Sequence, residues 1–235
     1  MRVFRGLVGR SQVPRSRSAD LLASAADGTP ALRVWRPPGV LAFGRRDARD
    51  PAFDRANRIA EDRGFEPIER DVGGRAVAYP GETLAFAHAV PLRGDSESIA
   101  DRYERATSTL VDALRGLGAD VVAGEPSASF CPGDHSLRVT GGGKVAGLAQ
   151  RVRSDAALVA GCVVVTPTDA GAIAAVTEPV YDALSVRFDP ASVGSVAAAG
   201  GPSDPDRVAR TVEDAFVDGP WGSGRRRTER LGGRE

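Results

Sequence analysis

Apolar residues recur every three or four positions between residues 96 and 117, the clearest helical pattern in the chain. Such spacing brings apolar side chains to one face of a helix, where they can be buried together. The residues that recur at this spacing are Ile99, Tyr103, Ala106, Leu110, Leu114 and Leu117.

Weaker patterns predict helices elsewhere in the chain. Pro51 suits the first turn of a helix and Gly64 suits a helix end. The Ser203-to-Asp206 spacing is typical of a capping box. These further helices are expected at 51–64, 168–184 and 204–217.

Strand patterns fill the middle of the chain, as short apolar runs separated by glycine and proline. The first two strands are broken at Pro37–Pro38 and end at Gly44, and a turn is expected at Pro80–Gly81. The hairpin-like spacings, with helices between and after the strands, predict an α+β fold. Its sheet would be mixed, largely antiparallel and flanked by helices. The predicted strands lie within 31–43, 65–90, 119–123, 135–139, 144–153 and 157–165.

The chain shows no internal repeat and no linker long enough to divide its 235 residues, of which 42% are hydrophobic. One large core is therefore expected, in a single domain at 1–218. The glycine- and arginine-rich segment 219–235 is predicted to be disordered. No G-x-G-x-x-G follows the first strand and TGGGKVAG lacks Walker A spacing, which argues against a dinucleotide or P-loop fold.

The charge balance gives no sign of a nucleic-acid or membrane partner, because Lys+Arg and Asp+Glu both total 31. The N-terminus lacks the apolar centre of a signal peptide, and no run approaches the ~18 apolar residues of a membrane span. Two cysteines allow at most one disulfide and no thiol-rich metal site. A reduced, cytoplasmic setting without a bound metal is therefore expected.

Two glycine-rich loops carry the chemistry. In ERDVGGRAVAY, Gly73 and Gly74 would let a ligand approach the backbone closely, with Arg70 and Arg75 on either side. Backbone N–H groups flanked by positive charge suit a carboxylate, a phosphate or a thioester oxygen. A plain hairpin turn with solvated arginines explains the same residues.

The second loop, SFCPGDHSLRVTGGGKVAGLAQRV, contains the sole lysine of a chain with 31 Lys and Arg residues in total. Cys131 precedes Pro-Gly, so its thiol is expected in a sharp turn where it is exposed for nucleophilic attack. A small buried hydrophobe is the other interpretation of Cys131. Lys144 follows on the return strand of a hairpin, where its ammonium can polarise an acyl carbonyl.

Three other residues are candidates for simpler roles. His135 is the nearest potential base to Cys131, but an exposed hairpin histidine explains it as well. Cys162, within LVAGCVVV, is interpreted as core packing. His88, within LAFAHAV, is interpreted as a satisfied histidine of the sheet.

RDVGGRAVAY and GGGKVAGLAQR together resemble the signature loops of the lipoate-protein ligase / biotin-protein ligase catalytic-domain family. Those loops are an Arg-x-x-Gly-Gly segment and a Gly-x-Lys-x-x-Gly-x-x-Gln-like strand, and the resemblance runs from about Leu32 to about Val165. FCPGDHSL is most similar to the branch of cysteine-dependent octanoyltransferases. These move an octanoyl group between the glycine-cleavage H protein and lipoyl domains.

By matching position, the resemblance implies that Cys131 accepts the acyl group and that Lys144 contacts the acyl carbonyl. An arginine is too bulky and too forked to replace a point-charge donor at a buried carbonyl, which would explain the retained lysine. The substrate-binding residues that the resemblance implies are Arg70, Gly73, Gly74, Arg75, Ala76, Gly147 and Gln150.

The chain departs from the ligase pattern in the first loop. Arg75 stands where the ligases usually have a third glycine, and Ala78-Tyr79-Pro80 lacks their histidine. The chain also has no room for an accessory C-terminal domain. These departures weaken the ligase interpretation more than the transferase interpretation.

The leading hypothesis is therefore a cysteine acyltransferase that passes an octanoyl or lipoyl group through a Cys131 thioester to a lysine of a lipoyl domain. It needs no cofactor, and its partners are the glycine-cleavage H protein and the acyltransferase subunits of 2-oxoacid dehydrogenases. One alternative is an ATP-dependent lipoate-protein ligase, which forms a lipoyl-adenylate with ATP and Mg. A second alternative is a non-catalytic acyl-carrier binding protein.

Overall fold

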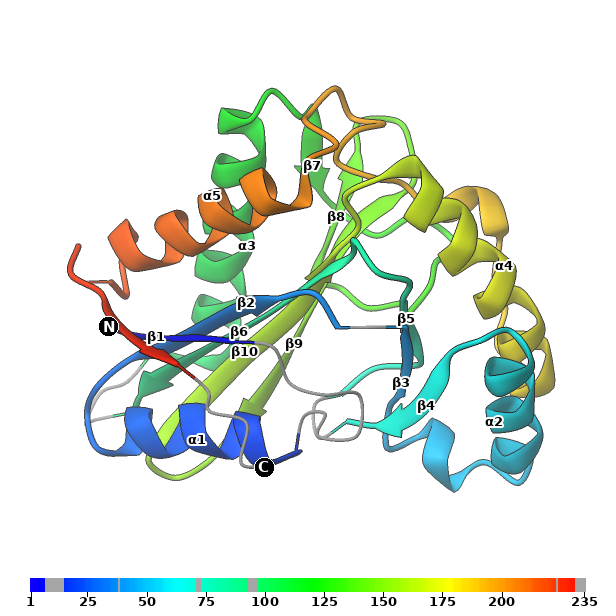
Figure 1. Ribbon diagram of the computed structural model, residues 1–235, viewed down its shortest axis with the longest axis horizontal. Helices are drawn as coiled ribbons and strands as arrows, with labels where there is room; N and C mark the ends of the chain where they lie inside the picture. Colours follow the sequence, from blue (N-terminus) through cyan, green and yellow to red (C-terminus); the bar gives the residue numbers. More distant parts are fainter. Residues whose placement is uncertain (7–14, 38, 71–72, 93–96, 223, 231–235) are drawn as a thin grey trace.

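The computed structural model describes residues 1–6, 15–37, 39–70, 73–92, 97–222 and 224–230 (Figure 1). Four positions or segments for which the sequence made predictions lie outside the described residues: Pro38, residues 71–72 of the first glycine loop, Ser96, and residues 231–235.

Two sheets and five helices make up the described part of the chain, which confirms the α+β prediction. The helices are α1 (Arg15–Ala26), α2 (Phe53–Asp62), α3 (Ile99–Gly116), α4 (Pro167–Ala183) and α5 (Pro205–Asp218). Short 3₁₀ turns lie at Asp47–Arg49 and Pro190–Ser192.

The large sheet has the strand order β11-β1-β2-β6-β10-β9-β8-β7, and the small sheet has the order β4-β3-β5. In the large sheet β11, β1 and β2 run parallel, and every later pair is antiparallel. The strands of the large sheet are β1 (Arg2–Arg5), β2 (Ala31–Trp35), β6 (Leu84–Pro91), β7 (Val121–Ala123), β8 (Ser136–Val139), β9 (Lys144–Val152), β10 (Ala156–Val163) and β11 (Arg227–Arg230). Those of the small sheet are β3 (Val40–Phe43), β4 (Glu66–Glu69) and β5 (Val77–Tyr79).

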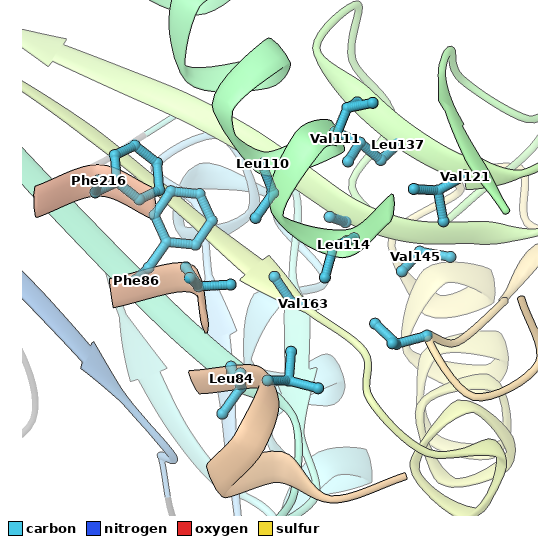
Figure 2. Close-up of a cluster of buried hydrophobic side chains, with 14 of the residues drawn as sticks. Leu84, Phe86, Leu110, Val111, Leu114, Val121, Leu137, Val145, Val163 and Phe216 are labelled. Atoms are coloured by element: carbon cyan, nitrogen blue, oxygen red, sulfur yellow. The ribbon is translucent and has the colours of Figure 1, made fainter. Parts of the chain in front are cut away.

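Helices cover both faces of the large sheet (Figure 1). Helices α3 and α5 pack on one face, where Phe86 of β6 and Phe216 of α5 bring their ring centroids to 5.5 Å (Figure 2). Helix α1 packs on the opposite face, against β6 and β10. Burial of these apolar faces supplies the main driving force for assembly.

The small sheet, α2 and α4 form a second apolar cluster beside the large sheet. Side chains alternate along β10, so Val163 enters the core under α3 whereas Cys162 faces this second cluster. On the sheet face that α1 covers, Ala160 and Cys162 lie further along β10 and form part of a cavity wall. The candidate site therefore lies where the small sheet meets the large one.

The predicted helices are confirmed, with small shifts at their starts. Helix α2 begins at Phe53, because Pro51 lies in the preceding turn. Helix α3 is capped by Ser98, which forms a capping box with Asp101. The cap of α5 is Asp204, one residue after the predicted Ser203, and its carboxylate accepts from the first backbone N–H groups of the helix.

The prediction of a disordered segment at 219–235 is wrong for Arg227–Arg230, which form β11 beside β1. Backbone pairing at a sheet edge needs no apolar side chain, so composition did not reveal it. Arg226 also pairs with Glu213 and Asp214 of α5, which fixes the chain before β11. The sequence patterns likewise gave no prediction for β1 and α1.

Candidate functional site

The two glycine-rich loops meet at one cavity of about 340 Å³, a volume typical of small-molecule sites. Its wall is mixed in polarity, with Arg70, Asp134 and His135 beside the small side chains of the sheet. Among the described residues, the lining comprises Arg70, Gly73, Gly74, Val77, Tyr103, Phe130, Cys131, Pro132, Gly133, Asp134, His135, Ser136, Gly147, Leu148, Ala149, Gln150, Ala160, Gly161 and Cys162.

Cys131 sits in the predicted sharp turn and lines the cavity with a half-buried side chain. Its φ of 43° lies in the left-handed region, which costs a non-glycine residue about 1–3 kcal/mol. Surrounding contacts must hold the backbone in that state. The interpretation of Cys131 as a buried hydrophobe is therefore not supported.

Arg70 is the cation next to the Cys131 sulfur. Its Nη2 donates to Cys131 Sγ at 3.1 Å and to the Arg75 carbonyl oxygen at 2.6 Å. Burial alone would lower the pKa of Arg70, but the neighbouring Cys131 and Tyr79 outweigh it and raise that pKa, so the guanidinium stays protonated. A fixed positive charge at this distance stabilises a thiolate.

The first glycine loop packs directly on this pair. A Cβ on Gly74 would lie 2.5 Å from Cys131 Sγ and 2.7 Å from Arg70 Nη2, and its φ is +99°. Only glycine fits such a position. Among the described residues, no atom would lie within 4 Å of a Cβ added to Gly73, apart from its own chain neighbours.

Arg75 and Ala76 support the loop from behind and are not among the cavity-lining residues. Arg75 Nη1 lies 2.7 Å from Oδ1 of the fully buried Asp47, whose other oxygen accepts from the Gly44 N–H. The plain hairpin with solvated arginines is therefore wrong, because Arg70 and Arg75 are both engaged by the protein.

Lys144 is fully buried beneath the Cys131 turn. Its Nζ lies 2.9 Å from Glu125 Oε2 and donates to the Cys131 carbonyl oxygen at 2.8 Å. Ser129 Oγ also donates to Glu125. Lys144 is not among the residues that line the cavity, but its ammonium contacts Cys131, which is one of them.

Gly147 and Gln150 of strand β9 both line the cavity. A Cβ on Gly147 would lie 3.0 Å from Lys144 Cε, so glycine leaves room for the lysine stem. The Gln150 side chain is bonded to α3: Oε1 accepts from Arg102 Nε at 2.9 Å, and Nε2 donates to the Ile99 carbonyl. Gln150 thus fixes α3 beside the cavity.

His135 is half-buried and stacks on Tyr103, with ring centroids 3.6 Å apart, so it is not the exposed hairpin histidine of the simpler interpretation. Cys162 is packed in the core as predicted, yet it also forms part of the cavity floor. Burial, and then the nearby Cys131, raise the pKa of Cys162 to about 11, so its thiol stays protonated at neutral pH.

His88 is a buried histidine of the sheet, but it is not satisfied. Neither ring nitrogen has a hydrogen-bond partner among the described residues. Its ring packs between Phe216 and Trp221 on the face away from the cavity. Burial lowers the pKa of His88 to about 3.

Sequence reasoning missed Glu125, Tyr103 and Tyr181. The Tyr181 hydroxyl accepts from the Cys131 N–H at 2.7 Å and donates to the Ala76 carbonyl at 2.8 Å. Nothing in its helical surroundings marks it. Glu125 left a weak signal, because a lone buried lysine needs a counter-ion and Glu125 lies shortly before Cys131.

The described residues contain no group of three or more His, Cys, Asp and Glu side chains that could hold a metal ion. Among the same residues, no helix has both the length and the apolar character needed to cross a membrane.

The chain matches the family described as the lipoyl protein ligase A/B catalytic domain over residues 18–217. It belongs to this family. The fold agrees: a crystal structure of lipoate-protein ligase A bound with ATP superposes with a TM-score of 0.69 at 20% identity. That likeness covers 90% of this chain and 81% of the other, and it shows the fold alone.

Curated relatives carry transferase names. An octanoyl-[GcvH]:protein N-octanoyltransferase of Exiguobacterium sp. is 33% identical over 131 residues, which cover 56% of this chain and 46% of that protein. A lipoyl-[GcvH]:protein N-lipoyltransferase of Listeria monocytogenes is 26% identical over 120 residues, which cover 51% and 43% respectively. The chain spans about half the length of the curated relatives it matches.

Proposed function

We propose that this chain transfers an octanoyl or lipoyl group to a lysine of a lipoyl domain through a thioester on Cys131. The observation that carries the proposal is the Cys131 sulfur at a cavity wall, 3.1 Å from the Arg70 guanidinium. The names of the curated relatives support the same reaction class.

The reaction divides into two acyl transfers. In the first, the Cys131 thiolate attacks the acyl carbonyl of the donor, an S–C bond forms, and the bond to the donor amine breaks as that amine takes up a proton. In the second, the acceptor lysine amine attacks the thioester, a C–N bond forms, the C–S bond breaks and the amine loses a proton. Cys131 leaves as a thiolate, and no oxidant or cofactor is consumed.

Two cations serve this chemistry in different ways. Arg70 stabilises the thiolate, both as nucleophile and as leaving group, because it donates to the sulfur. Lys144, at the start of β9, donates to the Cys131 carbonyl from beneath the cysteine turn. We assign Lys144 to the acyl carbonyl of the bound substrate, where its ammonium would stabilise the developing oxyanion. Because Lys144 is buried and does not line the cavity here, this role requires Nζ to exchange the Cys131 carbonyl for the substrate oxygen.

The remaining substrate contacts fall on the glycine loop and on strand β9. Gly73 leaves open backbone for the acyl head, and Gly74 lets the loop pack against Cys131 and Arg70. Arg75 and Ala76 hold the loop in place. Gly147 lies on the floor, and Gln150 fixes the far wall. The acyl chain would occupy the small-residue floor of the cavity.

The donor that fits best is the octanoyl- or lipoyl-loaded H protein, as in the names of the relatives. The acceptors are lipoyl domains, including those of 2-oxoacid dehydrogenase acyltransferase subunits. Because the mechanism needs a free thiol, the reaction belongs in a reducing compartment such as the cytoplasm.

The ATP-dependent ligase alternative finds less support in the site. ATP with Mg would need cations free to bind its phosphates. Arg70 is bonded to Cys131 and to the Arg75 carbonyl, and Arg75 is paired with the buried Asp47. These residues of the glycine loop therefore fit a nucleotide triphosphate poorly.

The decisive experiment is intact-mass spectrometry of the chain after incubation with octanoyl-loaded H protein in the absence of ATP. A single octanoyl adduct, mapped to the peptide that contains Cys131, is the expected result. Cys131→Ser serves as the matched control and should carry no thioester. An unmodified wild-type chain that binds the loaded H protein would instead support the non-catalytic binding alternative.

A further inference from the structure

Tyr181 ties the two loops of the site together through one hydroxyl group. It lies on α4, is fully buried in the cluster around the small sheet, and packs edge-on against Phe188 with ring centroids 5.6 Å apart. Its hydroxyl oxygen accepts a hydrogen bond from the Cys131 N–H at 2.7 Å, and its O–H donates to the Ala76 carbonyl oxygen at 2.8 Å. The Tyr181 hydroxyl thus links the cysteine turn to Ala76, the residue before β5.

The Tyr181 hydroxyl bonds a residue whose backbone conformation is strained. Cys131 has a φ of 43°, which a non-glycine residue keeps only when its surroundings hold it there. Three contacts do so: Tyr181 on the N–H, Lys144 on the carbonyl, and Arg70 on the sulfur. Tyr181 also bonds the Ala76 carbonyl, and Arg70 also bonds the Arg75 carbonyl, so both side chains join the cysteine turn to the segment before β5.

The hydroxyl therefore sets the spacing between the sulfur and its cation. Arg70 Nη2 bonds the Arg75 carbonyl, next to Ala76, and Cys131 Sγ at once. If the cysteine turn drifts away from this segment, Arg70 can keep only one of the two bonds. Burial raises the pKa of Tyr181, so the phenol stays protonated and can both donate and accept.

We propose that Tyr181 is a positioning residue for the Cys131 nucleophile, holding its turn against the glycine loop so that the sulfur stays beside Arg70. The inference rests on the proposed function of Cys131. The Cys131 N–H is already bonded to Tyr181, so it is not free to donate to the negative oxygen that forms during acyl transfer.

The test compares Tyr181→Phe with wild type. The variant keeps the ring and removes one oxygen, so the core stays filled while the Cys131 N–H and the Ala76 carbonyl lose their partner. Thr177→Val is the matched control, because Thr177 is buried one turn earlier on α4 and its hydroxyl has no partner among the described residues.

Two measurements separate positioning from mere stability. The first is the iodoacetamide alkylation rate of Cys131 as a function of pH, followed by peptide mass spectrometry. We expect Tyr181→Phe to be alkylated more slowly than wild type, because its sulfur loses the contact with Arg70, while Thr177→Val matches wild type. The second is acyl transfer, where kcat should fall about tenfold with KM little changed.

A Tyr181→Phe protein that melts at a lower temperature but keeps the wild-type alkylation profile and kcat would overturn the proposal. If Tyr181→Phe does not fold, Phe188→Leu replaces it, because this change loosens the packing of the Tyr181 ring. The alkylation of Cys131 should change in the same direction. Alkylation that matches wild type would count against the proposal. Alkylation needs no acyl donor. A wild-type chain that transfers nothing therefore rejects the proposed function, while the profile of Tyr181→Phe still decides the role of Tyr181.

Discussion

The Lys144 ammonium lies 2.9 Å from the Glu125 carboxylate and is fully buried beneath the cysteine turn. The single lysine of the chain is thus held by a counter-ion from one side and by the Cys131 carbonyl from the other. A buried charge needs such pairing, since an unpaired ammonium would cost several kcal/mol of desolvation. The Lys144 ammonium is therefore held next to Cys131 in the absence of a substrate.

Lys144→Arg should lose most of the activity, about a hundredfold in kcat, while the protein still folds. The variant keeps the positive charge but replaces a point donor by a wider fork, which also overpacks the site by about 1–3 kcal/mol. Steady-state transfer to a lipoyl domain and urea unfolding measure the two effects. Near-normal turnover would mean that Lys144 does not contact the reacting carbonyl.

Glu125→Gln tests the other half of the pair. It leaves the Lys144 ammonium buried without a counter-charge, so we expect the free energy of unfolding to fall by about 3 kcal/mol. Exchanging an exposed acid for its amide, as in Glu178→Gln on α4, should leave stability within about 0.5 kcal/mol of wild type. A stable Glu125→Gln protein would show that the Cys131 carbonyl and the Phe130 ring, whose centroid lies 5.1 Å from Lys144 Nζ, satisfy the ammonium without a counter-charge.

Cys131→Ser separates the two enzyme hypotheses. If the thiol is the nucleophile, modification of a lipoyl domain should fall at least about a thousandfold, because serine has no comparable anionic form at neutral pH. An ATP-dependent ligase would scarcely respond, since its activated acyl group is an adenylate. The assay is run with and without ATP, and ATP-dependent modification that survives Cys131→Ser would replace the transferase proposal by the ligase.

Arg70→Gln should slow alkylation of Cys131 at pH 7 by about tenfold, because the sulfur loses its charged hydrogen-bond donor. Arg70→Lys keeps the positive charge but not the planar guanidinium, so its alkylation rate should lie between those of wild type and Arg70→Gln. Arg46→Gln, at an exposed arginine, is the control. Equal alkylation rates in all four proteins would remove Arg70 from the mechanism.

His88 predicts acid sensitivity of the fold. Its pKa is about 3 in the folded chain and about 6.5 when unfolded, because burial disfavours the charged ring. The unfolded state then binds the extra proton, so the stability that depends on neutral His88 is present above about pH 6.5 and declines as pH falls toward 3. Between pH 7.5 and 5.0 the loss should be about 2 kcal/mol.

The measurement is urea unfolding of wild type and His88→Leu at both pH values. Carboxylates titrate in both proteins, so the difference between their pH dependences isolates His88. Wild type should lose about 2 kcal/mol more than the variant over this interval. Equal losses would show that the imidazole is not buried as a neutral ring in solution.

Local patterns were enough to predict the elements that carry the site. The periodicity from Ile99 onward predicted α3, and the glycine-bounded apolar runs predicted β9 and β10. Helical spacing and hairpin punctuation are properties of neighbouring residues, so they are readable from the chain alone. The Cys131 turn, the lone Lys144 and the Gly73–Gly74 pair were identified in the same way.

The tertiary structure decided which partners these residues have. Tyr181 lies 50 residues from Cys131, and Asp47 lies 28 residues from Arg75. Contacts at such separations depend on how sheets and helices pack, and no local pattern encodes them. The same holds for β11, whose pairing with β1 joins the two ends of the chain through backbone groups that every sequence possesses.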